Sequence, residues 1–237
     1  MPLPANTSSG RALLTRPANI LAQIRTLALG LSASARWWLG DEATLTAWVD
    51  RIGGVSAAAG GSGLAFGALG GRRAIAFGGA GYYTSAAFAA GAVAQPHTLI
   101  VVAQSNLSAP SGSMHMVDGR DTSNRAAIYQ AVTTGRVGYN AGAGVTSGTA
   151  MGTSPAVVRA TFHSPSGSEL RLNGTQISTA DSGANAWAGI NIGVDRALNS
   201  PTMWQGTIAT ILSLPGVTAG NATAAQIETL LRAYYGF

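Results

Sequence analysis

Three histidines and one close pair of aspartates are the side chains best suited to bind a metal ion or move a proton. His97, His115 and His163 lie far apart in the chain and share no metal-site spacing. We interpret them as strand-end or loop residues. Only a Gly-Arg pair separates Asp118 from Asp121, whereas calcium takes roughly six to eight oxygen ligands. We therefore expect a solvated turn there rather than a calcium site, and no metal or cofactor.

The cysteines and lysines that many enzymes use in catalysis are missing. The chain has no Cys, and its 14 basic residues are all Arg. These absences exclude a thiolate nucleophile, a Schiff-base lysine and a P-loop lysine. No Gly-x-Ser-x-Gly sequence is present to anchor a hydrolase triad. The composition thus argues against most enzyme classes.

Aromatic side chains are the remaining groups that could recognise a ligand, by stacking on the faces of sugar rings. The candidates for glycan binding are Tyr129, Tyr139 and Trp187. Tyr129 and Tyr139 lie in strand-like segments and could equally face a core. A glycan site also needs a concave surface, and residue spacing alone does not predict one.

The 237-residue chain is poor in charge, with 10% charged residues and a formal net charge of +5. Its arginines are scattered, and only Arg72 and Arg73 are adjacent. No stretch alternates basic and aromatic residues, as a nucleic-acid platform would. No apolar run approaches the ~20 residues that span a bilayer. We expect neither direct nucleic-acid binding nor membrane insertion.

The first 35 residues differ in pattern from the rest. Residues 1–16 are predicted to form an extended arm, and a helix is predicted from Pro17 to Leu29, with Gly30 as its cap. Arg25 interrupts the apolar centre of this segment, which argues against a secretion signal. Its apolar stripe could pack on its own domain or on another protein. We expect it to dock on a partner through Ile20, Leu21, Ile24, Leu27 and Leu31.

Short β-type runs separated by Gly, Ser and Asn clusters follow this segment. They lie at Ala74–Phe77, Thr98–Ala103, Ala126–Val132, Ala156–Phe162, Glu169–Leu172, Gln176–Ser178, Ala188–Ile192 and Thr207–Leu214. Asn173-Gly174 predicts a type I′ hairpin turn. The Ala/Gly-rich stretch Ser56–Gly71 is interpreted as a loop held to the core by Leu64, Phe66 and Leu69.

The chain closes with a predicted helix from Ala224 to Tyr235, with a capping box at Thr223 and a stop at Gly236. Many short strands with turn signals between them are typical of a sandwich or barrel. The predicted fold is therefore all-β: a two-sheet antiparallel jelly-roll sandwich with a short N-terminal helix and a C-terminal helix.

Several landmarks occur in an order that resembles the concanavalin A-like lectin/glucanase superfamily, specifically its laminin-G-like (LamG) jelly-roll modules, which are common in bacteria and phages. They are Trp37-Trp38-Leu39-Gly40-Asp41, Trp48-Val49-Asp50, Arg73-Ala74-Ile75-Ala76-Phe77-Gly78-Gly79, Glu169-Leu170-Arg171-Leu172-Asn173-Gly174, Trp204-Gln205-Gly206 and the terminal Tyr234-Tyr235-Gly236. The resemblance covers residues 36–237 and implies that residues 1–35 form a separate attachment segment. It also implies that Trp48 and Trp204 fill the core and that the last helix docks over the sandwich edge.

Some members of that superfamily cleave glycans with a Glu-x-Asp-x-x-Glu strand, because retaining hydrolysis needs two neighbouring carboxylates. The three glutamates here, Glu42, Glu169 and Glu228, do not form that arrangement. We expect no enzymatic activity.

The predicted function is a structural protein of a bacteriophage-like virion, made in the host cytoplasm, either a head decoration or part of a tail fibre or tail tip. Residues 1–35 would anchor it to other virion proteins or to identical subunits, and the sandwich could contact a host surface glycan. The alternative is a free-standing carbohydrate-binding module.

Overall fold

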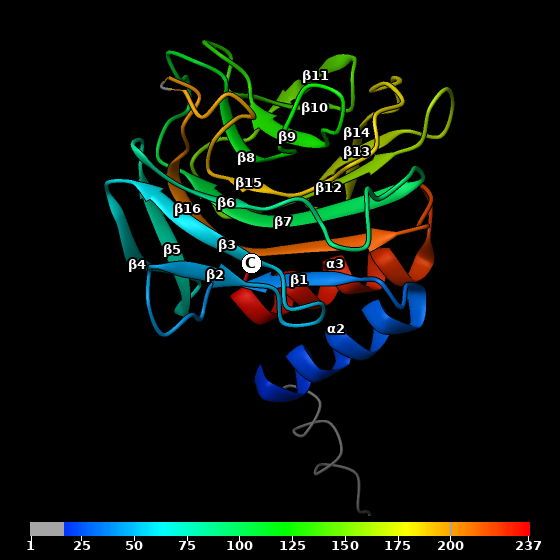
Figure 1. Cartoon of the computed structure of the whole chain (residues 1–237), viewed down its shortest axis with the longest axis horizontal. Coiled ribbons are helices and arrows are strands. Elements are labelled where there is room, and N and C mark those ends of the chain that lie inside the picture. Colours follow the sequence, from blue (N-terminus) through cyan, green and yellow to red (C-terminus); the bar gives the residue numbers. More distant parts are fainter. Residues whose placement is uncertain (1–16, 200) are drawn as a thin grey trace, which may run out of the picture.

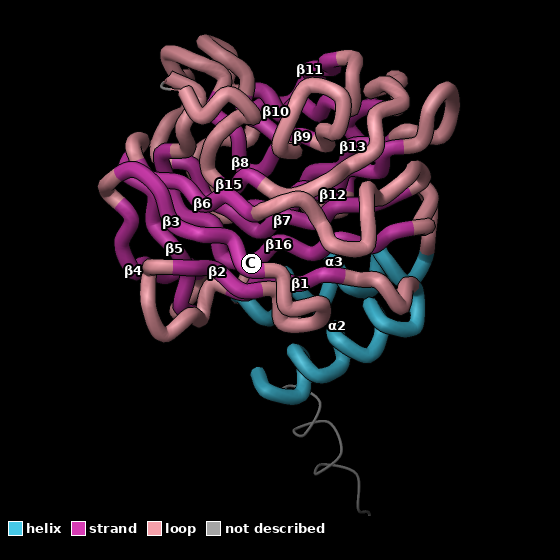
Figure 2. The backbone as a smooth tube through the Cα atoms, in the orientation of Figure 1, coloured by secondary structure: helices cyan, strands magenta, loops and turns pink. Residues whose placement is uncertain are grey.

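The computed structural model describes residues 17–199 and 201–237 (Figure 1). They form two eight-stranded sheets in which every pairing between strands is antiparallel, and two helices. The tube in Figure 2 shows both helices on one side of the stacked sheets. The predicted β-sandwich with a helix before and after it is confirmed. The predicted arm, residues 1–16, lies outside the described residues.

We call the sheet next to the helices sheet A. Its strand β1 (Arg36–Leu39) pairs with β16 (Gln205–Pro215) and lies outside the main series of paired strands. In spatial order the strands of that series are β14 (Thr175–Ser178), β13 (Glu169–Leu172), β12 (Ala156–Phe162), β7 (His97–Ser105), β16, β5 (Arg72–Gly78) and β4 (Leu64–Leu69). Sheet B runs β11 (Gly144–Ala150), β10 (Arg136–Asn140), β9 (Ala127–Gln130), β8 (Met114–Asp118), β15 (Asn191–Ile192), β6 (Gly81–Ser85), β3 (Ser56–Gly61) and β2 (Ala47–Val49).

The central strands of sheet A are buried on both faces, as β7 illustrates. Successive side chains of a strand point to opposite faces. Leu99 and Val101 therefore enter the core between the two sheets, whereas Ile100 and Val102 enter a second core beneath the helices. Trp48 and Trp204 are fully buried between the sheets, as the resemblance implied.

The two helices α2 (Pro17–Leu31) and α3 (Ala222–Tyr235) pack on each other and on the face of sheet A (Figure 1). The last helix therefore covers a sheet face and not the sandwich edge. Asn221 caps α3 by accepting a hydrogen bond from the Ala224 amide at 2.9 Å, so the predicted cap at Thr223 is wrong. Gly236 ends the helix in the left-handed conformation, as predicted.

The apolar stripe of α2 is used within this chain. Ile20 and Ile24 are buried in the core beneath the helices, so the prediction that they dock on another protein is wrong for them. Leu21, Leu27 and Leu31 are half-buried against the same core. The cause is that the outer face of sheet A is itself apolar, and α2 and α3 together cover it. Among the described residues, no helix has the length and hydropathy needed to cross a bilayer.

The Ala/Gly-rich stretch forms two strands, β3 and β4, so the prediction of a loop is wrong. The chain crosses from sheet B to sheet A between them, through Ser62 and Gly63. Leu69 is buried, but Phe66 is 43% exposed on the edge strand β4 beneath the Arg73 guanidinium. Leu64 packs against the core between the sheets, so the predicted contacts of Leu64 and Leu69 with the core are confirmed and that of Phe66 is wrong.

The Asn173-Gly174 hairpin is confirmed, with φ of 51° and 85° at the two residues. We expect Gly174→Val to lower the free energy of unfolding by about 1–3 kcal/mol, because a β-branched residue resists positive φ. Gly174→Asn should cost less, since Asn tolerates that region better. Denaturant titration of both variants tests this, and equal stability of Gly174→Val and the wild type would contradict it.

Candidate functional site

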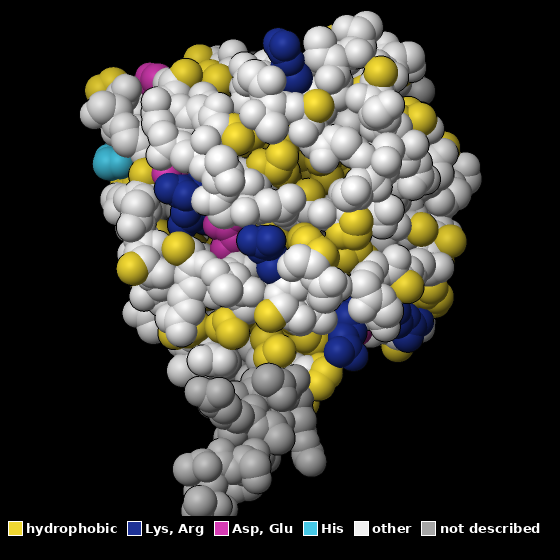
Figure 3. Space-filling model, turned by 180° about the vertical axis from the view of Figure 1, so that it is seen from behind, with side chains coloured by type: hydrophobic (Ala, Val, Ile, Leu, Met, Phe, Trp, Pro, Cys, Tyr) yellow, Lys and Arg dark blue, Asp and Glu magenta, His cyan; other side chains and the backbone are white. Residues whose placement is uncertain are grey.

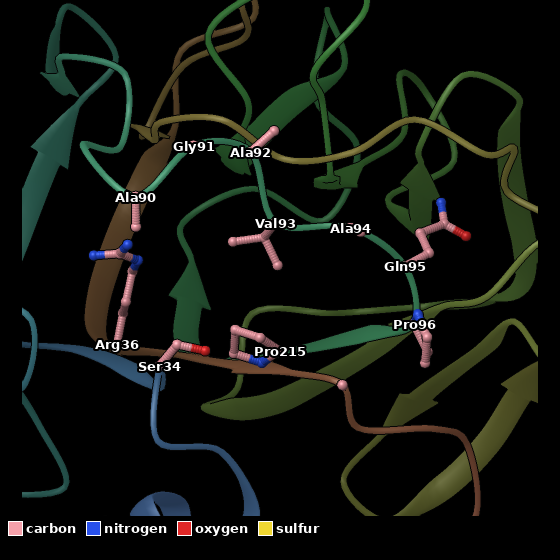
Figure 4. A pocket seen from close by; sticks show the side chains of 11 residues that line it. Ser34, Arg36, Ala90, Gly91, Ala92, Val93, Ala94, Gln95, Pro96 and Pro215 are labelled. Carbon is pink, nitrogen blue, oxygen red and sulfur yellow. The ribbon is translucent and has the colours of Figure 1, made fainter.

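Two hollows are candidates for a binding site. The first, of about 370 Å³, lies between the loop at residues 90–96, the start of β1 and the end of β16 (Figure 4). Its lining is mostly small apolar side chains and backbone. The Gln95 amide is committed to the Ser164 amide and two backbone carbonyls, and Arg36 lies over the Phe88 ring at 4.2 Å. This hollow offers little polar recognition.

The second hollow, of about 300 Å³, is richer in groups that can bind a ligand. It lies on the outer face of sheet B, where no helix of the described chain covers the strands. Its lining includes His115, Arg125, Tyr129, Asn140, Thr146 and Arg196. We take it as the candidate functional site and call it the sheet B hollow.

Strand alternation places the side chains of the sheet B hollow. On β9, Ile128 enters the core and Tyr129 points outward; on β10, Tyr139 enters the core and Asn140 points outward. On β8, His115 lies between two buried methionines and pairs across the strands with Tyr129. The two rings lie 5.3 Å apart between centroids.

Tyr129 is held as a fixed ring over its cross-strand neighbour Gly138. A Cβ atom at position 138 would collide with the ring, so only glycine lets the tyrosine lie on the sheet. The phenol donates a hydrogen bond to the Val145 carbonyl at 3.1 Å and lies 3.2 Å from the Thr146 hydroxyl. The ring is half-buried, and its place at a hollow agrees with the predicted glycan contact, which stays a prediction.

The other two predicted glycan residues cannot stack on a sugar. Tyr139 is fully buried, and its hydroxyl donates to the Ala180 carbonyl. Trp187 is also fully buried, with its ring 4.9 Å from Phe88 and 6.2 Å from Trp38 between centroids. Both predictions are wrong because these rings supply the aromatic bulk that fills the space between the sheets.

A buried carboxylate organises the base of the sheet B hollow. Asp118 is fully buried and accepts from Arg125 through Nε at 3.1 Å and Nη2 at 2.7 Å. It also accepts from the backbone amides of Gly119 at 2.8 Å and Arg196 at 3.2 Å. This pairing offsets the cost of burying the charge and fixes the Arg125 side chain.

His115 is uncharged in this setting at neutral pH. Burial lowers the pKa of its imidazole below the ordinary value of 6.5, although Asp118 acts in the opposite direction. Nδ1 lies 3.2 Å from the Ser113 carbonyl, and Nε2 lies 4.0 Å from the Asp118 carboxylate. A neutral imidazole presents a flat, partly apolar surface beside Tyr129.

The remaining acidic candidates have structural partners. Asp121 accepts from the amides of Ser123 and Asn124 at 2.9 and 2.8 Å. The carboxylates of Glu169 on β13 and Glu228 on α3 lie on either side of the buried Arg159, outside the sheet B hollow. Within residues 17–199 and 201–237, no three His, Cys, Asp or Glu side chains gather as a metal site would require.

No protein-family model matches the chain, and no curated protein matches it in sequence. Solved structures do share its fold. Domain 4 of an extracellular GH43 arabinanase from Geobacillus stearothermophilus, solved with arabinotriose, has a TM-score of 0.61 at 10% identity, over 82% of this chain and 96% of that one.

Two further structures extend this similarity. The Trypanosoma rangeli sialidase in complex with sialic acid gives a TM-score of 0.61 at 12% identity, over 94% of this chain. The binding domain of botulinum neurotoxin DC with rat synaptotagmin II gives 0.62 at 11%, over 84%. This chain spans 39% of the sialidase and 52% of the neurotoxin domain. At such identities, the similarity shows a shared jelly-roll-type β-sandwich.

Proposed function

We propose that this chain is a lectin-like carbohydrate-binding module, without enzymatic activity, whose site is the sheet B hollow. The observation that carries this proposal is the difference between the two outer faces. Helices α2 and α3 cover sheet A, while sheet B offers a hollow with a fixed aromatic ring and polar side chains around it. A few well-placed polar groups beside an aromatic surface are the usual composition of a small-ligand site.

The side chains of the hollow match the chemistry of a sugar. The Tyr129 ring is held by its hydroxyl and by Gly138, so little conformational entropy is lost when a sugar ring stacks on it. Guanidinium and amide groups of Arg125, Arg196 and Asn140 surround it and can donate hydrogen bonds to hydroxyl oxygens. The face in Figure 3 is mostly uncharged, with charged side chains in a few separate places, in keeping with the 10% of charged residues in the chain.

We expect Tyr129→Ala to weaken glycan binding about tenfold or more, because it removes the stacking surface. A glycan array followed by calorimetry on the best-binding sugar measures the change. Tyr82→Ala is the matched control, since Tyr82 also lies over a cross-strand glycine of sheet B, Gly60, but does not line the hollow. Equal weakening by both substitutions would contradict the assignment of the site.

Gly138→Ala provides a second variant that leaves the tyrosine in place. Its Cβ would push the Tyr129 ring off the sheet, so binding should fall while the fold is kept. Silence of the wild-type protein on the array would overturn the proposed function, and release of sugar fragments from a glycan polymer by the pure protein would overturn its non-enzymatic part.

The setting of the module on a virion stays a proposal. It is supported by the low charge of the chain, since a surface built from Gly, Ala, Ser, Thr and Asn is tolerated best where partners cover much of it. Copurification of the protein with intact particles tests this setting, and its absence from washed particles would contradict it.

A further inference from the structure

The carboxylate and side-chain amide oxygens at the sheet B hollow are already used as acceptors within the chain. The Asp118 carboxylate accepts from Arg125 and from two backbone amides. Asp195, the residue before Arg196, accepts from the amides of Ala197 and Asn199 at 3.1 and 3.4 Å. The Asn140 side-chain oxygen accepts from the Gly142 amide at 2.8 Å. A ligand that donates hydrogen bonds therefore meets few free acceptors.

Several hydrogen-bond donors that line the hollow, in contrast, have no partner among the described residues. Arg196 uses its Nε on the Thr122 hydroxyl at 3.3 Å, and its two Nη atoms have no partner in the described part of the chain. Arg125 uses Nε and Nη2 on Asp118, which leaves Nη1 without a partner among the described residues. The Asn140 Nδ2 group is likewise unused over residues 17–199 and 201–237. The lining thus offers more donors than acceptors.

The hollow also has more positive than negative charge available to a ligand. Arg125 forms an ion pair with Asp118, but Arg196 has no acidic side chain within 4.0 Å among the residues that the structure describes. Arg196 is half-buried at the hollow, where a guanidinium is less well solvated than in open water. A planar, unpaired guanidinium is well suited to bind a carboxylate through two parallel hydrogen bonds.

We propose that the sheet B hollow takes an acidic sugar, with the ring on Tyr129 and the carboxylate at Arg196. This proposal rests on the proposed carbohydrate-binding function and names its ligand class. Arg125 has a different role: it compensates the buried Asp118, so it contributes one further donor from a fixed position. Binding should weaken with added salt, because part of it depends on an ion pair near the surface.

The test begins with an array that carries sialylated, uronate-containing, sulfated and neutral glycans. The best-binding acidic glycan is then compared by calorimetry with its own methyl ester, which keeps every ring but removes the charge. We expect the ester to bind about tenfold more weakly. Arg196→Gln should abolish this difference. Arg136→Gln is the control, since it removes the same charge from an exposed position of sheet B outside the hollow.

The outcomes separate this inference from the proposed function. Neutral glycans that bind as tightly as acidic ones, or an unchanged preference in Arg196→Gln, would overturn the acidic-sugar inference and leave the carbohydrate-binding function standing. A preference for sulfated over carboxylated glycans would also overturn it as stated. Binding of sodium acetate alone with the same affinity would show a simple anion site and overturn the role of the sugar. The absence of any glycan binding would overturn both proposals.

Discussion

We expect Arg159→Met to lower the free energy of unfolding by about 3–5 kcal/mol, the usual cost of removing one partner from a buried ion cluster. Arg159 is buried between two carboxylates, with Nε 3.3 Å from Glu228 and Nη2 3.7 Å from Glu169. Glu228 belongs to α3 and the other two residues to sheet A, so the cluster ties the helix to the sheet. Methionine fills a similar volume but removes the ion-pair partner of Glu228, on which Arg171 and Arg232 also act electrostatically.

Two further variants separate the charge effect from lost packing. Arg159→Met/Glu228→Gln should recover most of the lost stability, because Glu169 keeps its contact with Arg171 at 2.9 Å. Arg171→Met is the matched control: it leaves Arg159 with both carboxylates, and its side chain is 25% exposed, so it should cost less. Denaturant titration of all variants measures these free energies of unfolding. A loss under about 1 kcal/mol for Arg159→Met would contradict the stabilising role of this ion cluster.

The pH dependence of the Arg159→Met variant gives an independent readout. Burial raises the pKa of Glu228 above its ordinary 4.5, and Arg159 opposes this. Without Arg159 the folded state binds a proton more readily than the unfolded state over the range between their pKa values. Stability falls as pH rises wherever the folded state binds more protons. The deficit of the variant should therefore be larger at pH 7 than at pH 5.

Local patterns in the sequence predict much of the sandwich. Ala156–Phe162 and Glu169–Leu172 form strands with the predicted bounds, because the first is a mostly apolar run and the second alternates charged and apolar residues before an Asn-Gly turn. β3 and β4 escape prediction because their Ala and Gly residues carry no strong β-propensity. β3 becomes a strand through pairing with β6, which lies farther along the chain, and local composition does not encode such pairing. β4 forms a hairpin with β5 across Gly70-Gly71, with φ of 56° and 72°, so a local turn signal for it was present in the sequence.

The candidate site is less predictable than the fold, because it depends on which face each strand residue takes. Tyr129 and Tyr139 look alike in sequence, yet the first points outward and the second inward. The sequence does contain a pattern that indicates an outward-facing His115, because a polar residue between Met114 and Met116 is typical of a strand with one solvated face. Arg196 lies in a loop, where no periodicity could have placed it beside Arg125.

His97 is the second residue from which a large effect is expected. It begins β7 and is fully buried, with its ring 4.8 Å from Phe162 and 6.1 Å from Trp187 between centroids. Neither ring nitrogen has a hydrogen-bond partner in the described part of the chain. The neutral imidazole thus acts as a flat aromatic spacer, and a protonated one would be a buried charge without a partner.

Acid should therefore destabilise this protein through His97. Burial lowers the pKa of the imidazole from 6.5 to about 3. Between these values the unfolded state binds the proton and the folded state does not, so stability is complete above pH 6.5 and is lost as pH falls toward 3. At about 1.4 kcal/mol per pH unit, the whole loss amounts to roughly 3–5 kcal/mol.

His97→Phe keeps the stacked ring and removes the titrating group. Denaturant titrations at pH 7, 5 and 4 should show the variant gaining steadily on the wild type as pH falls. Carboxylates that titrate in both proteins cancel in this difference. Two stability curves that stay parallel down to pH 4 would mean that His97 takes up its proton in the folded state, and the tightly packed environment assigned to it would then be wrong.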